Sequence, residues 1–416
     1  MRCFLLSKLI ISIALIIFNQ ISSNCEIFDD VKTIFIEDKL YCLGSLQFFY
    51  VDLAGISLDT DELVKESKWI DLTNIKPKPD KLALFDSPIP GGNKIMFLEE
   101  FASNFYVNTF DTTLKKWNIN ENVKILQPMN PITVFTEVWT FDEKTGKSYS
   151  LDDNVVIFDT INMVINYIAS NPFQGSLSFY NKYAQVLVPN GQILFIGGQI
   201  DNEIASMKPM NNLLIYDTIN DTWQIVNTTG KTPEVRTDHT AVSTSDGRVI
   251  VFGGVSKQSV PALPHLSVLD TSKIPYEWST PTVENPIGAF SGHTSVMVKN
   301  YMISAFGRNE SNKDPLIKTN SEDLYKLNVT DPLKYKWSLL AKFNYNISTI
   351  GITPTMFGGN NSSIQTKVSA AASSSFYEDV SRTRVAIIVL FVIIVLICIS
   401  IIFYYKKKQK NQEIKQ

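Results

Sequence analysis

The stretch Ile193-Leu194-Phe195-Ile196-Gly197-Gly198, four apolar residues followed by two glycines, decides the fold because it returns further along the chain. The later copies are 249–254 (Val-Ile-Val-Phe-Gly-Gly) and 303–308 (Ile-Ser-Ala-Phe-Gly-Arg), the last having lost its second glycine. Fourteen residues before the first glycine of each copy stands an aromatic or imidazole side chain: Tyr183, His239 and His293. A period of roughly 50 residues built from short strands is typical of a propeller or a solenoid.

The second half of each unit repeats as well. After the glycines comes a hydrophobic run ending in Asp or Asn, and then a tryptophan; the pairs are Asp217 with Trp223, Asp270 with Trp278, and Asn328 with Trp337. Such short apolar runs, bounded by turn residues and with no sustained 3.6-residue period, favour strands over helices.

Three weaker units precede these copies. The first has a second strand at 40–44, a third at 49–52 and then Trp69; the next has 95–98, with Glu99-Glu100 in place of the glycines, 107–111 and Trp117. In the weakest, 138–141 is expected to be the second strand and 155–159 the third, and Ile165 replaces the tryptophan. The chain therefore contains six units of about 52 residues between roughly residues 30 and 340.

These residues resemble the kelch motif, and the best match is Arg236-Thr237-Asp238-His239 with Asp246-Gly247 before the diglycine. The resemblance implies an all-β fold, a six-bladed kelch-type β-propeller of four-stranded blades, with seven blades as the alternative. Glycines are expected where the backbone needs positive φ, aspartates where a turn needs an acceptor, and tryptophans where neighbouring sheets pack. The repeat residues are Gly197, Gly198, Gly253, Gly254, Gly307, Asp217, Asp270, Trp117, Trp223, Trp278 and Trp337.

From Ile347 onward the repeat fails, and the two ends of the chain indicate a membrane protein. Residues 1–24 have a basic start, an apolar core and small residues at Ser22-Ser23, as a signal peptide does. Residues 385–405 form an almost wholly aliphatic run long enough for one transmembrane helix. The lysine-rich tail 406–416 places that end in the cytoplasm. Residues 25–350 are then a propeller ectodomain, and the Ser/Ala-rich segment 351–384 a stalk.

An ectodomain in an oxidising compartment predicts further covalent features. Cys25 and Cys42 are expected to form a disulfide, with two free thiols as the alternative. Either residues 26–28 or residues 347–352 are expected to close the ring by adding a strand to an end blade, with the N-terminal segment favoured. Asn-x-Ser/Thr sequons, candidates for N-glycosylation, occur at Asn220, Asn227, Asn309, Asn328, Asn346, Asn360 and Asn361.

No catalytic constellation stands out, so no catalytic residue, metal ligand or cofactor is expected. Kelch propellers include copper-radical sugar oxidases similar to galactose oxidase, but this chain has only three histidines, and His239 and His293 sit in the repeat register. A glycosidase site built from a pair of carboxylates is a further alternative, because the residue types of the chain do not exclude it. The formal net charge of the whole chain is −3, and the lysine-rich tail adds positive charge to that total, so the ectodomain is more acidic than the chain as a whole. An acidic ectodomain argues against nucleic acid as its partner.

The sequence thus favours a single-pass protein, at the plasma membrane rather than an internal membrane, whose extracellular propeller binds a protein or a glycan. The alternatives are a carbohydrate-active enzyme of the sugar-oxidase kind and a spacer or coat component. Long insertions are the candidate binding loops, since sites on propellers lie on loops carried by a rigid scaffold. They are expected on one face, between second and third strands, at 54–68, 201–212, 256–265 and 309–322.

Overall fold

The fold is described by a computed structural model. It describes residues 31–44, 48–65, 68–76, 88–101, 104–126, 138–151, 155–168, 180–200, 207–257, 260–311, 319–321 and 323–342. The chain divides into two compact units, Met1–Ile347 and Ser348–Gln416, and all described residues belong to the first. The predicted signal peptide, stalk, transmembrane helix, tail and ring-closing segments 26–28 and 347–352 lie outside the described residues.

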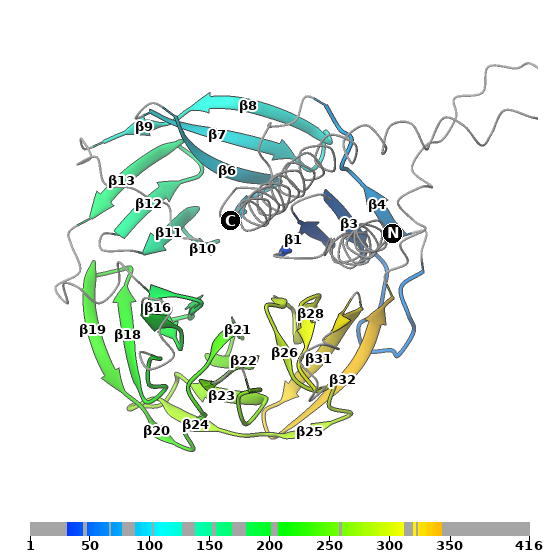
Figure 1. Ribbon diagram of the computed structural model, residues 1–416. Coiled ribbons are helices and arrows are strands. Elements are labelled where there is room, and N and C mark those ends of the chain that lie inside the picture. The colour runs from blue at the N-terminus through cyan, green and yellow to red at the C-terminus, as the bar shows by residue number, and fades with distance from the viewer. Residues whose placement is uncertain are drawn as a thin grey trace, which may run out of the picture. The chain divides into compact units, whose positions relative to one another are not determined.

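Within the described residues, six antiparallel sheets follow one another along the chain and form a closed ring (Figure 1), so the prediction of an all-β, six-bladed propeller is confirmed. Blades 1 to 3 contain β1 (Lys32–Ile36), β2 (Lys39–Leu43), β3 (Phe48–Asp52), β4 (Trp69–Asp71); β5 (Ile89–Gly91), β6 (Lys94–Phe101), β7 (Asn104–Asp111), β8 (Lys116–Asn122); and β10 (Thr140–Asp142), β11 (Lys147–Leu151), β12 (Val155–Asp159), β13 (Val164–Ile168). Blades 4 to 6 contain β15 (Ala184–Leu187), β16 (Gln192–Ile196), β18 (Asn212–Asp217), β19 (Thr222–Asn227); β21 (Thr237–Ser243), β22 (Arg248–Val255), β23 (Leu266–Asp270), β24 (Glu277–Ser279); and β27 (Thr294–Val298), β28 (Tyr301–Ala305), β31 (Leu324–Asp331), β32 (Lys334–Ala341).

Short segments between blades add a fifth strand to three of the sheets. β9 (Lys124–Ile125), β20 (Thr229–Gly230) and β25 (Thr282–Glu284) each pair in parallel with the outer strand of the following blade. Two small sheets lie beside the blades and are made of β14 (Tyr180–Asn181) with β17 (Gln199–Ile200), and of β26 (Phe290–Ser291) with β29 (Arg308–Asn309) and β30 (Thr319–Asn320).

The hydrophobic core is divided among the seams between blades. Each of six buried clusters combines residues of two adjacent blades, as in the cluster that joins Val186 and Leu194 of blade 4 to Val249 and Trp278 of blade 5. Trp117, Trp278 and Trp337 are each at most 2% exposed and lie in the seam with the preceding blade. Burying a ring of that size typically contributes about 3–5 kcal/mol, as judged by truncation.

The weakest unit differs from its prediction by one strand. Residues 140–142 form β10, the first strand of blade 3, and β11 at 147–151 is the second strand. The third strand was predicted correctly, and Ile165 pairs with Phe158 as Trp278 pairs with Leu269. The error arose because blade 3 lacks the diglycine that marks the end of the second strand. Without this marker the first and second strands, both short, cannot be distinguished by sequence.

In blade 6 the missing glycine is the first one and not the second. Phe306 (φ 61°) and Gly307 (φ 77°) take the places of Gly253 (φ 69°) and Gly254 (φ 87°). The strand registers show this, because Leu327 pairs with Met302 and Trp337 as Leu269 pairs with Val249 and Trp278. Four residues lie between the paired positions Met297 and Met302 of blade 6, against five between the equivalent Ser243 and Val249 of blade 5. The shorter hairpin reduced the spacing on which the prediction relied.

Blade 1 meets blade 6 without exchanging a strand among the described residues, because each of the two blades supplies its own four. A segment that we call the closing strap, residues 53–65 between β3 and β4, crosses from blade 1 to blade 6. Its Val64 amide donates to the Leu340 carbonyl (2.9 Å), and the buried Lys326 ammonium of blade 6 donates to the carbonyls of Leu58 (2.8 Å) and Thr60. The inner strands β1 and β27 also touch, and the hydroxyls of Thr33 and Thr294 lie 2.7 Å apart.

Candidate interaction face

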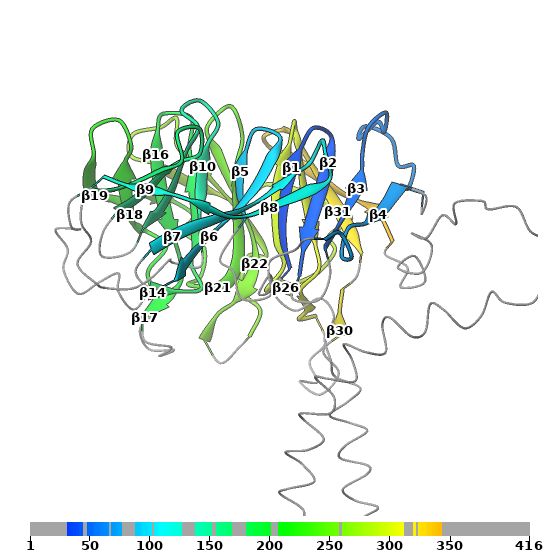
Figure 2. The same ribbon diagram turned by 90° about the horizontal axis from the view of Figure 1, so that it is seen from above.

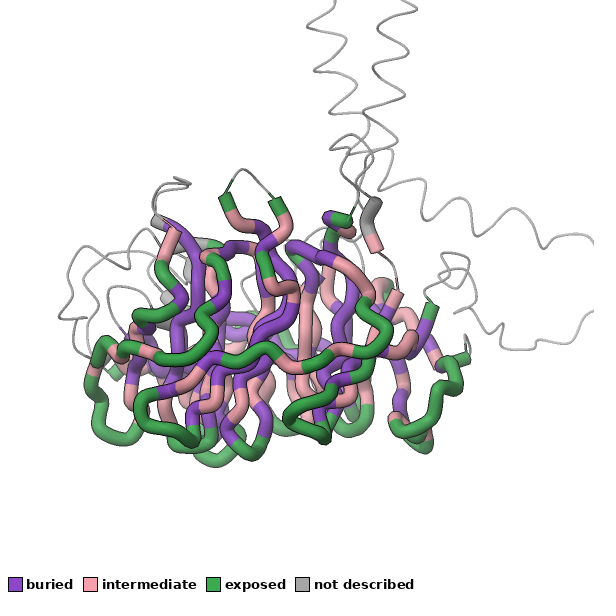
Figure 3. The backbone as a smooth tube through the Cα atoms, turned by 90° about the horizontal axis from the view of Figure 1, so that it is seen from below, coloured by how far each residue is buried: buried purple, intermediate pink, exposed green. Residues whose placement is uncertain are grey.

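The connections between second and third strands lie at one end of the propeller, which we call the loop face; the opposite end, with the hairpin turns, is the turn face. The described parts of three of the four predicted binding loops, 201–212, 256–265 and 309–322, lie at the loop face, where strands project beyond the blades in Figures 2 and 3. The fourth, 54–68, was wrongly assigned, because it connects β3 to β4 and therefore belongs to the turn face as the closing strap. Its length is used to bridge two blades.

A buried arginine holds the longest described part of the loop face. Arg236 is fully buried, and its guanidinium donates to the carbonyls of Glu234 (3.2 Å), Gly253 (2.9 Å), Leu263 (3.2 Å) and Pro264 (3.0 Å). Burial lowers the pKa of Arg236 to about 10, and the nearby Glu234 carboxylate opposes that shift. Four carbonyl dipoles take the place of a carboxylate partner, so the arginine works as a clamp that fixes the loop at 260–265.

Blade 6 uses a buried carboxylate in the same way. Glu310, 4% exposed, accepts a hydrogen bond from the Ser291 hydroxyl (2.5 Å), and the Arg308 side chain lies 3.9 Å away. Its amide also donates to the Ala289 carbonyl (2.8 Å), so the strand that follows Gly307 is tied to the segment entering blade 6. Half of the Arg308 side chain is exposed and carries positive charge on this face.

Nearer the central axis, three equivalent positions form a chain from blade to blade. Lys182, Asp238 and Gly292 all have positive φ, at 56°, 55° and 61°. The Asp238 amide points to the Lys182 carbonyl (3.4 Å), and the Gly292 amide donates to the Asp238 carbonyl (2.9 Å). The Lys182 and Asp238 side chains also lie within ion-pair distance, at 3.5 Å. Two non-glycine residues thus adopt the left-handed conformation, and the surrounding hydrogen bonds hold them there.

The exposed surface of the loop face combines apolar and charged groups. Val260 and Leu263 are each 53% exposed on the loop that Arg236 clamps, and the Leu263 amide is itself bound by the Glu234 carboxylate (2.8 Å). Lys257 is exposed beside them. Fixed aliphatic side chains flanked by charges of both signs form a surface that suits a polypeptide, which offers apolar side chains and charges together.

The histidines are divided between the seams and this face. An added Cβ on Gly197 would lie 2.6 Å from the His239 Cε1 atom, and one on Gly253 would lie 2.7 Å from that of His293, so each imidazole fills the space beside a glycine of the preceding blade. Burial lowers the pKa of both histidines to about 3, so both are neutral near pH 7. His265, half-buried, lies in the clamped loop with its Nδ1 atom 3.2 Å from the Ala262 carbonyl.

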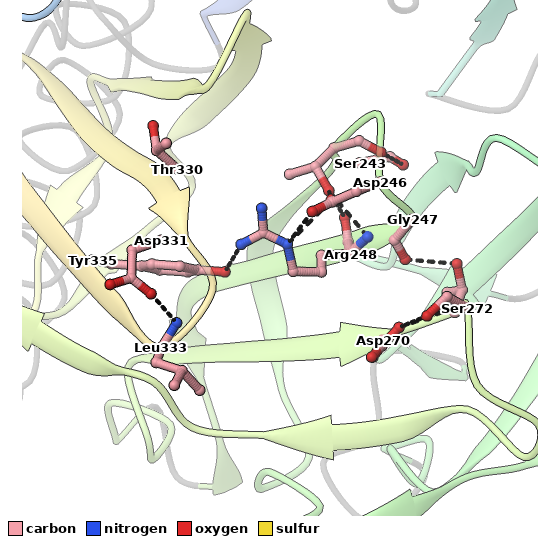
Figure 4. Close-up of polar contacts among 12 residues, drawn as sticks. Ser243, Asp246, Gly247, Arg248, Asp270, Ser272, Thr330, Asp331, Leu333 and Tyr335 are labelled. Atoms are coloured by element: carbon pink, nitrogen blue, oxygen red, sulfur yellow. Dashed lines mark hydrogen bonds and ion pairs between the residues drawn. The ribbon is translucent and has the colours of Figure 1, made fainter.

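The turn face has a repeated polar construction that is internal to each blade. Asp217 accepts the amides of Ile219 (2.9 Å) and Asn220 (3.0 Å), and Asp270 accepts that of Ser272 (3.0 Å). Figure 4 shows the neighbouring tie between blades, in which Arg248 binds Asp246 (2.9 Å) and donates to the Tyr335 hydroxyl (2.7 Å). These carboxylates are engaged in turns and ion pairs, which agrees with the interpretation of the repeat aspartates as turn acceptors.

A cavity of about 240 Å³ lies at the strap, between the hairpins of blades 1 and 6. Phe35, Leu58 and Val298 are among its apolar lining residues, and Asp59 and Tyr301 are among its polar ones. The Tyr301 hydroxyl donates to the Asp59 carboxylate (2.5 Å), and burial together with that carboxylate raises the pKa of Tyr301 to about 12.

The remaining predicted residues have the following places. Among the described residues Cys42 is a free thiol with an exposed fraction of 0%, in the seam between blades 6 and 1. Cys25 lies outside the described residues, so the disulfide between the two stays a prediction. Of the sequons, Asn220 and Asn227 are exposed and Asn309 and Asn328 half-buried, whereas Asn346, Asn360 and Asn361 lie outside the described residues.

In the described part of the chain, no three His, Cys, Asp or Glu side chains come together in a group that would hold a metal ion. Nor does this part contain a helix long and apolar enough to cross a membrane.

Arg236 and Glu310 were not recognised as important from the sequence. Arg236 is part of the kelch motif match, but the motif did not predict its role. The partners of both residues are set by packing between segments that are distant in the chain. A buried arginine bound to carbonyls leaves no local pattern apart from its recurrence in a repeat.

The geometry defines a β-propeller of the kelch class, and comparison with known proteins agrees. A family model described as the KLHDC2/KLHL20/DRC7 Kelch-repeats domain matches residues 137–370, more than half of the chain. The chain therefore belongs to the kelch-repeat family.

Among curated proteins, the chain is similar to two of Arabidopsis thaliana. Acyl-CoA-binding domain-containing protein 5 is 28% identical over 43% of this chain and 27% of its own length. Acyl-CoA-binding domain-containing protein 4 is 27% identical over 59% of this chain and 36% of its own length. The chain thus spans about a third of these relatives. The solved structure of YjhT superposes with a TM-score of 0.50 at 12% identity, covering 75% of this chain and 97% of that one, which shows a shared fold.

Proposed function

We propose that this protein is a single-pass membrane protein whose propeller lies outside the cell and binds a protein or glycan through the loop face. The location is supported by the predicted signal peptide at 1–24 and the predicted transmembrane helix at 385–405. The binding role is supported by the kelch fold, which is generally used for interaction. In this proposal the propeller acts as a binding module and performs no catalysis.

The observation that carries the binding role is the clamp at Arg236. A guanidinium that is completely buried and donates to four carbonyls costs desolvation, and it fixes a loop whose outward side chains, Val260 and Leu263, are apolar and exposed. A loop held rigid loses less conformational entropy when a partner binds, which raises affinity.

The test is a binding array of cell-surface proteins and glycans, probed with the full chain in detergent. We expect ligands to be lost in the Val260→Ser/Leu263→Ser variant and in variants whose loops 201–211 or 309–322 are replaced by short turns. A matched control is Leu114→Ser/Ile161→Ser, which removes two aliphatic side chains from the turn face that are more exposed (72% and 74%) than Val260 and Leu263. Binding that survives all loop-face changes, or that only the turn-face control removes, would contradict the proposal.

The proposed location has a separate test. Intact cells that express the chain with an epitope at either end are treated with a membrane-impermeant biotin reagent and with antibodies. We expect labelling of propeller lysines and detection of the C-terminal epitope only after permeabilisation. Labelling of the tail in intact cells would contradict the orientation while leaving the loop-face proposal standing.

A further inference from the structure

The outer edges of the six blades are protected unequally. β13, β24 and β32 are each covered by a short parallel strand from the preceding blade. In the described part of the chain the outer edges of β4, β8 and β19 have no such strand. An open edge presents unpaired backbone groups that can pair with another chain, so natural proteins shorten, charge or bulge such strands.

Two of these three edges, which no further described strand covers, show these devices. β4 has only three residues. β8 carries Lys116 and Glu121, and its pairing with β7 is irregular between Val107 and Thr109.

β19 shows none of these devices. Its six residues, Thr-Trp-Gln-Ile-Val-Asn, are uncharged and pair with β18 in unbroken register. Ile225 on this strand is 47% exposed, and Ile219 in the turn before it is 73% exposed. A regular, uncharged edge with exposed aliphatic side chains is the kind of strand that promotes association.

Sequons stand at both ends of this strand. Asn220 lies in the turn before β19 and Asn227 is the last residue of that strand. Both are exposed, and the six-residue strand spans about 20 Å. The Asn227 Oδ1 atom accepts a hydrogen bond from Asn212 (2.8 Å), which leaves its amide nitrogen outside that bond. The Asn220 amide nitrogen donates to Asp217 (3.0 Å), and a glycosylated amide keeps one N–H for such a bond.

We propose that Asn220 and Asn227 carry N-linked glycans and that these glycans shield the outer edge of blade 4, where no described strand pairs with β19 beyond β18. In the reaction the side-chain amide nitrogen forms a bond to the anomeric carbon of a lipid-diphosphate-linked oligosaccharide. The sugar–phosphate bond breaks, the lipid diphosphate leaves with its electron pair, and the amide loses one proton. This inference rests on the extracellular location of the proposed function, and it assigns to the glycans the protection that charge and length provide elsewhere.

Asn328 provides the internal contrast. Its amide nitrogen donates to the Tyr301 hydroxyl (3.2 Å), its Oδ1 atom accepts the Thr330 amide (2.9 Å), and the residue is half-buried beside the closing strap. A glycan there would have to displace the strap contacts of Tyr301. We expect Asn328 to be unmodified.

The first experiment is peptide mass spectrometry of the full chain, made in a eukaryotic secretory host, before and after enzymatic release of N-glycans. We expect release to convert Asn220 and Asn227 to aspartate and to leave Asn328 unchanged. Asn220 and Asn227 unmodified in a protein whose signal peptide has been removed would overturn the glycan proposal alone. An intact signal peptide with no glycan at any sequon would overturn both this proposal and the proposed location.

The second experiment tests the shielding. In light-scattering measurements on the purified full chain, we expect Asn220→Gln/Asn227→Gln to aggregate several-fold faster than the parent. Adding Ile225→Lys, which places a charge on the edge, should return the rate to that of the parent. Thr330→Ala, which removes the sequon of Asn328, is the control and should change nothing. Equal rates for parent and double variant, or no rescue by the lysine, would overturn the shielding role.

Discussion

Two seams of the propeller solve the same packing problem with opposite residues. Between blades 5 and 6, Gly253 at φ 69° leaves space that the His293 imidazole fills. Between blades 6 and 1, the glycine position holds Phe306 at φ 61°, and the residue before the inner strand, where His293 stands in blade 6, is Val31. Phe306 and Val31 belong to the same buried cluster. The ring that fills the seam thus comes from the following blade at the seam between blades 5 and 6, and from the preceding blade at the seam between blades 6 and 1.

The comparison shows that the seam requires filled volume, since protein interiors are close-packed and tolerate exchanges that conserve total volume. It also shows a cost specific to the closing seam. A non-glycine residue in the left-handed region costs roughly 1–2 kcal/mol, whereas burying a phenylalanine contributes about 1.5–3 kcal/mol. The two energies are comparable, and the strap adds further contacts at the closing seam.

The largest expected effect is at the repeat seam. Gly253→Ala would place a Cβ 2.3 Å from the Phe290 carbonyl oxygen and 2.7 Å from the imidazole, at an unfavourable φ. We expect the free energy of unfolding to fall by about 4 kcal/mol. Denaturant titration measures it, with Gly55→Ala as the control, because Gly55 has φ 72° but a methyl group added there would have no heavy atom within 4 Å. Equal losses in both variants would show that backbone strain, and not the imidazole contact, sets the cost.

The second prediction converts the closing seam into a repeat seam. Phe306→Gly relieves the φ strain but empties a buried site, and Val31→His crowds it, so we expect each single change to cost about 3 kcal/mol. The double variant should be more stable than the sum of the two predicts, by about 1–2 kcal/mol. Unfolding measurements on all four proteins give this coupling energy. Strict additivity would mean that the two positions do not share one space.

The same comparison explains what the sequence could and could not predict. Trp278 and Asp270 were placed correctly because their roles are fixed by the strand and turn that contain them. The lost glycine of blade 6 was misassigned because a turn shortened at Lys299 and a substituted glycine give the same local pattern. The role of the 54–68 insertion was missed because its partners, Lys326 and Leu340, are more than 260 residues away in the chain.

The third prediction uses pH to separate the seams. His239 and His293 have pKa values of about 3 when folded, against about 6.5 when unfolded, so below pH 6.5 the unfolded chain binds protons that the native state does not. The contribution of the two neutral histidines to stability is fully present above pH 6.5. Below that pH the free energy of unfolding falls, by about 2 kcal/mol per histidine at pH 5. Denaturant titrations at pH 7 and pH 5 measure the loss.

The control for that experiment is His239→Gln/His293→Gln, which is expected to be less stable at pH 7 but to lose less between pH 7 and pH 5. The seam between blades 6 and 1 carries Val31 at this position and has no imidazole to titrate. If the double variant retained the full acid sensitivity of the parent, the loss would have to come from carboxylates, and the seam histidines would not be its cause.

The smallest expected effect concerns the closing strap. Lys326→Met removes the ammonium that binds the carbonyls of Leu58 and Thr60, and those carbonyls lose a charged donor. Because the strap is one local element, we expect it to open more readily while the rest of the propeller stays folded, with protection of the Val64 amide falling about tenfold. Hydrogen exchange read by mass spectrometry measures it, with the Gly292 amide of the repeat seam as the internal reference. Lys336→Met, which removes only an exposed ion pair with Asp61 (3.3 Å), should leave Val64 protected, because exposed pairs contribute little. Unchanged exchange at Val64 in Lys326→Met would mean that the apolar cluster closes the ring without the strap's polar contacts.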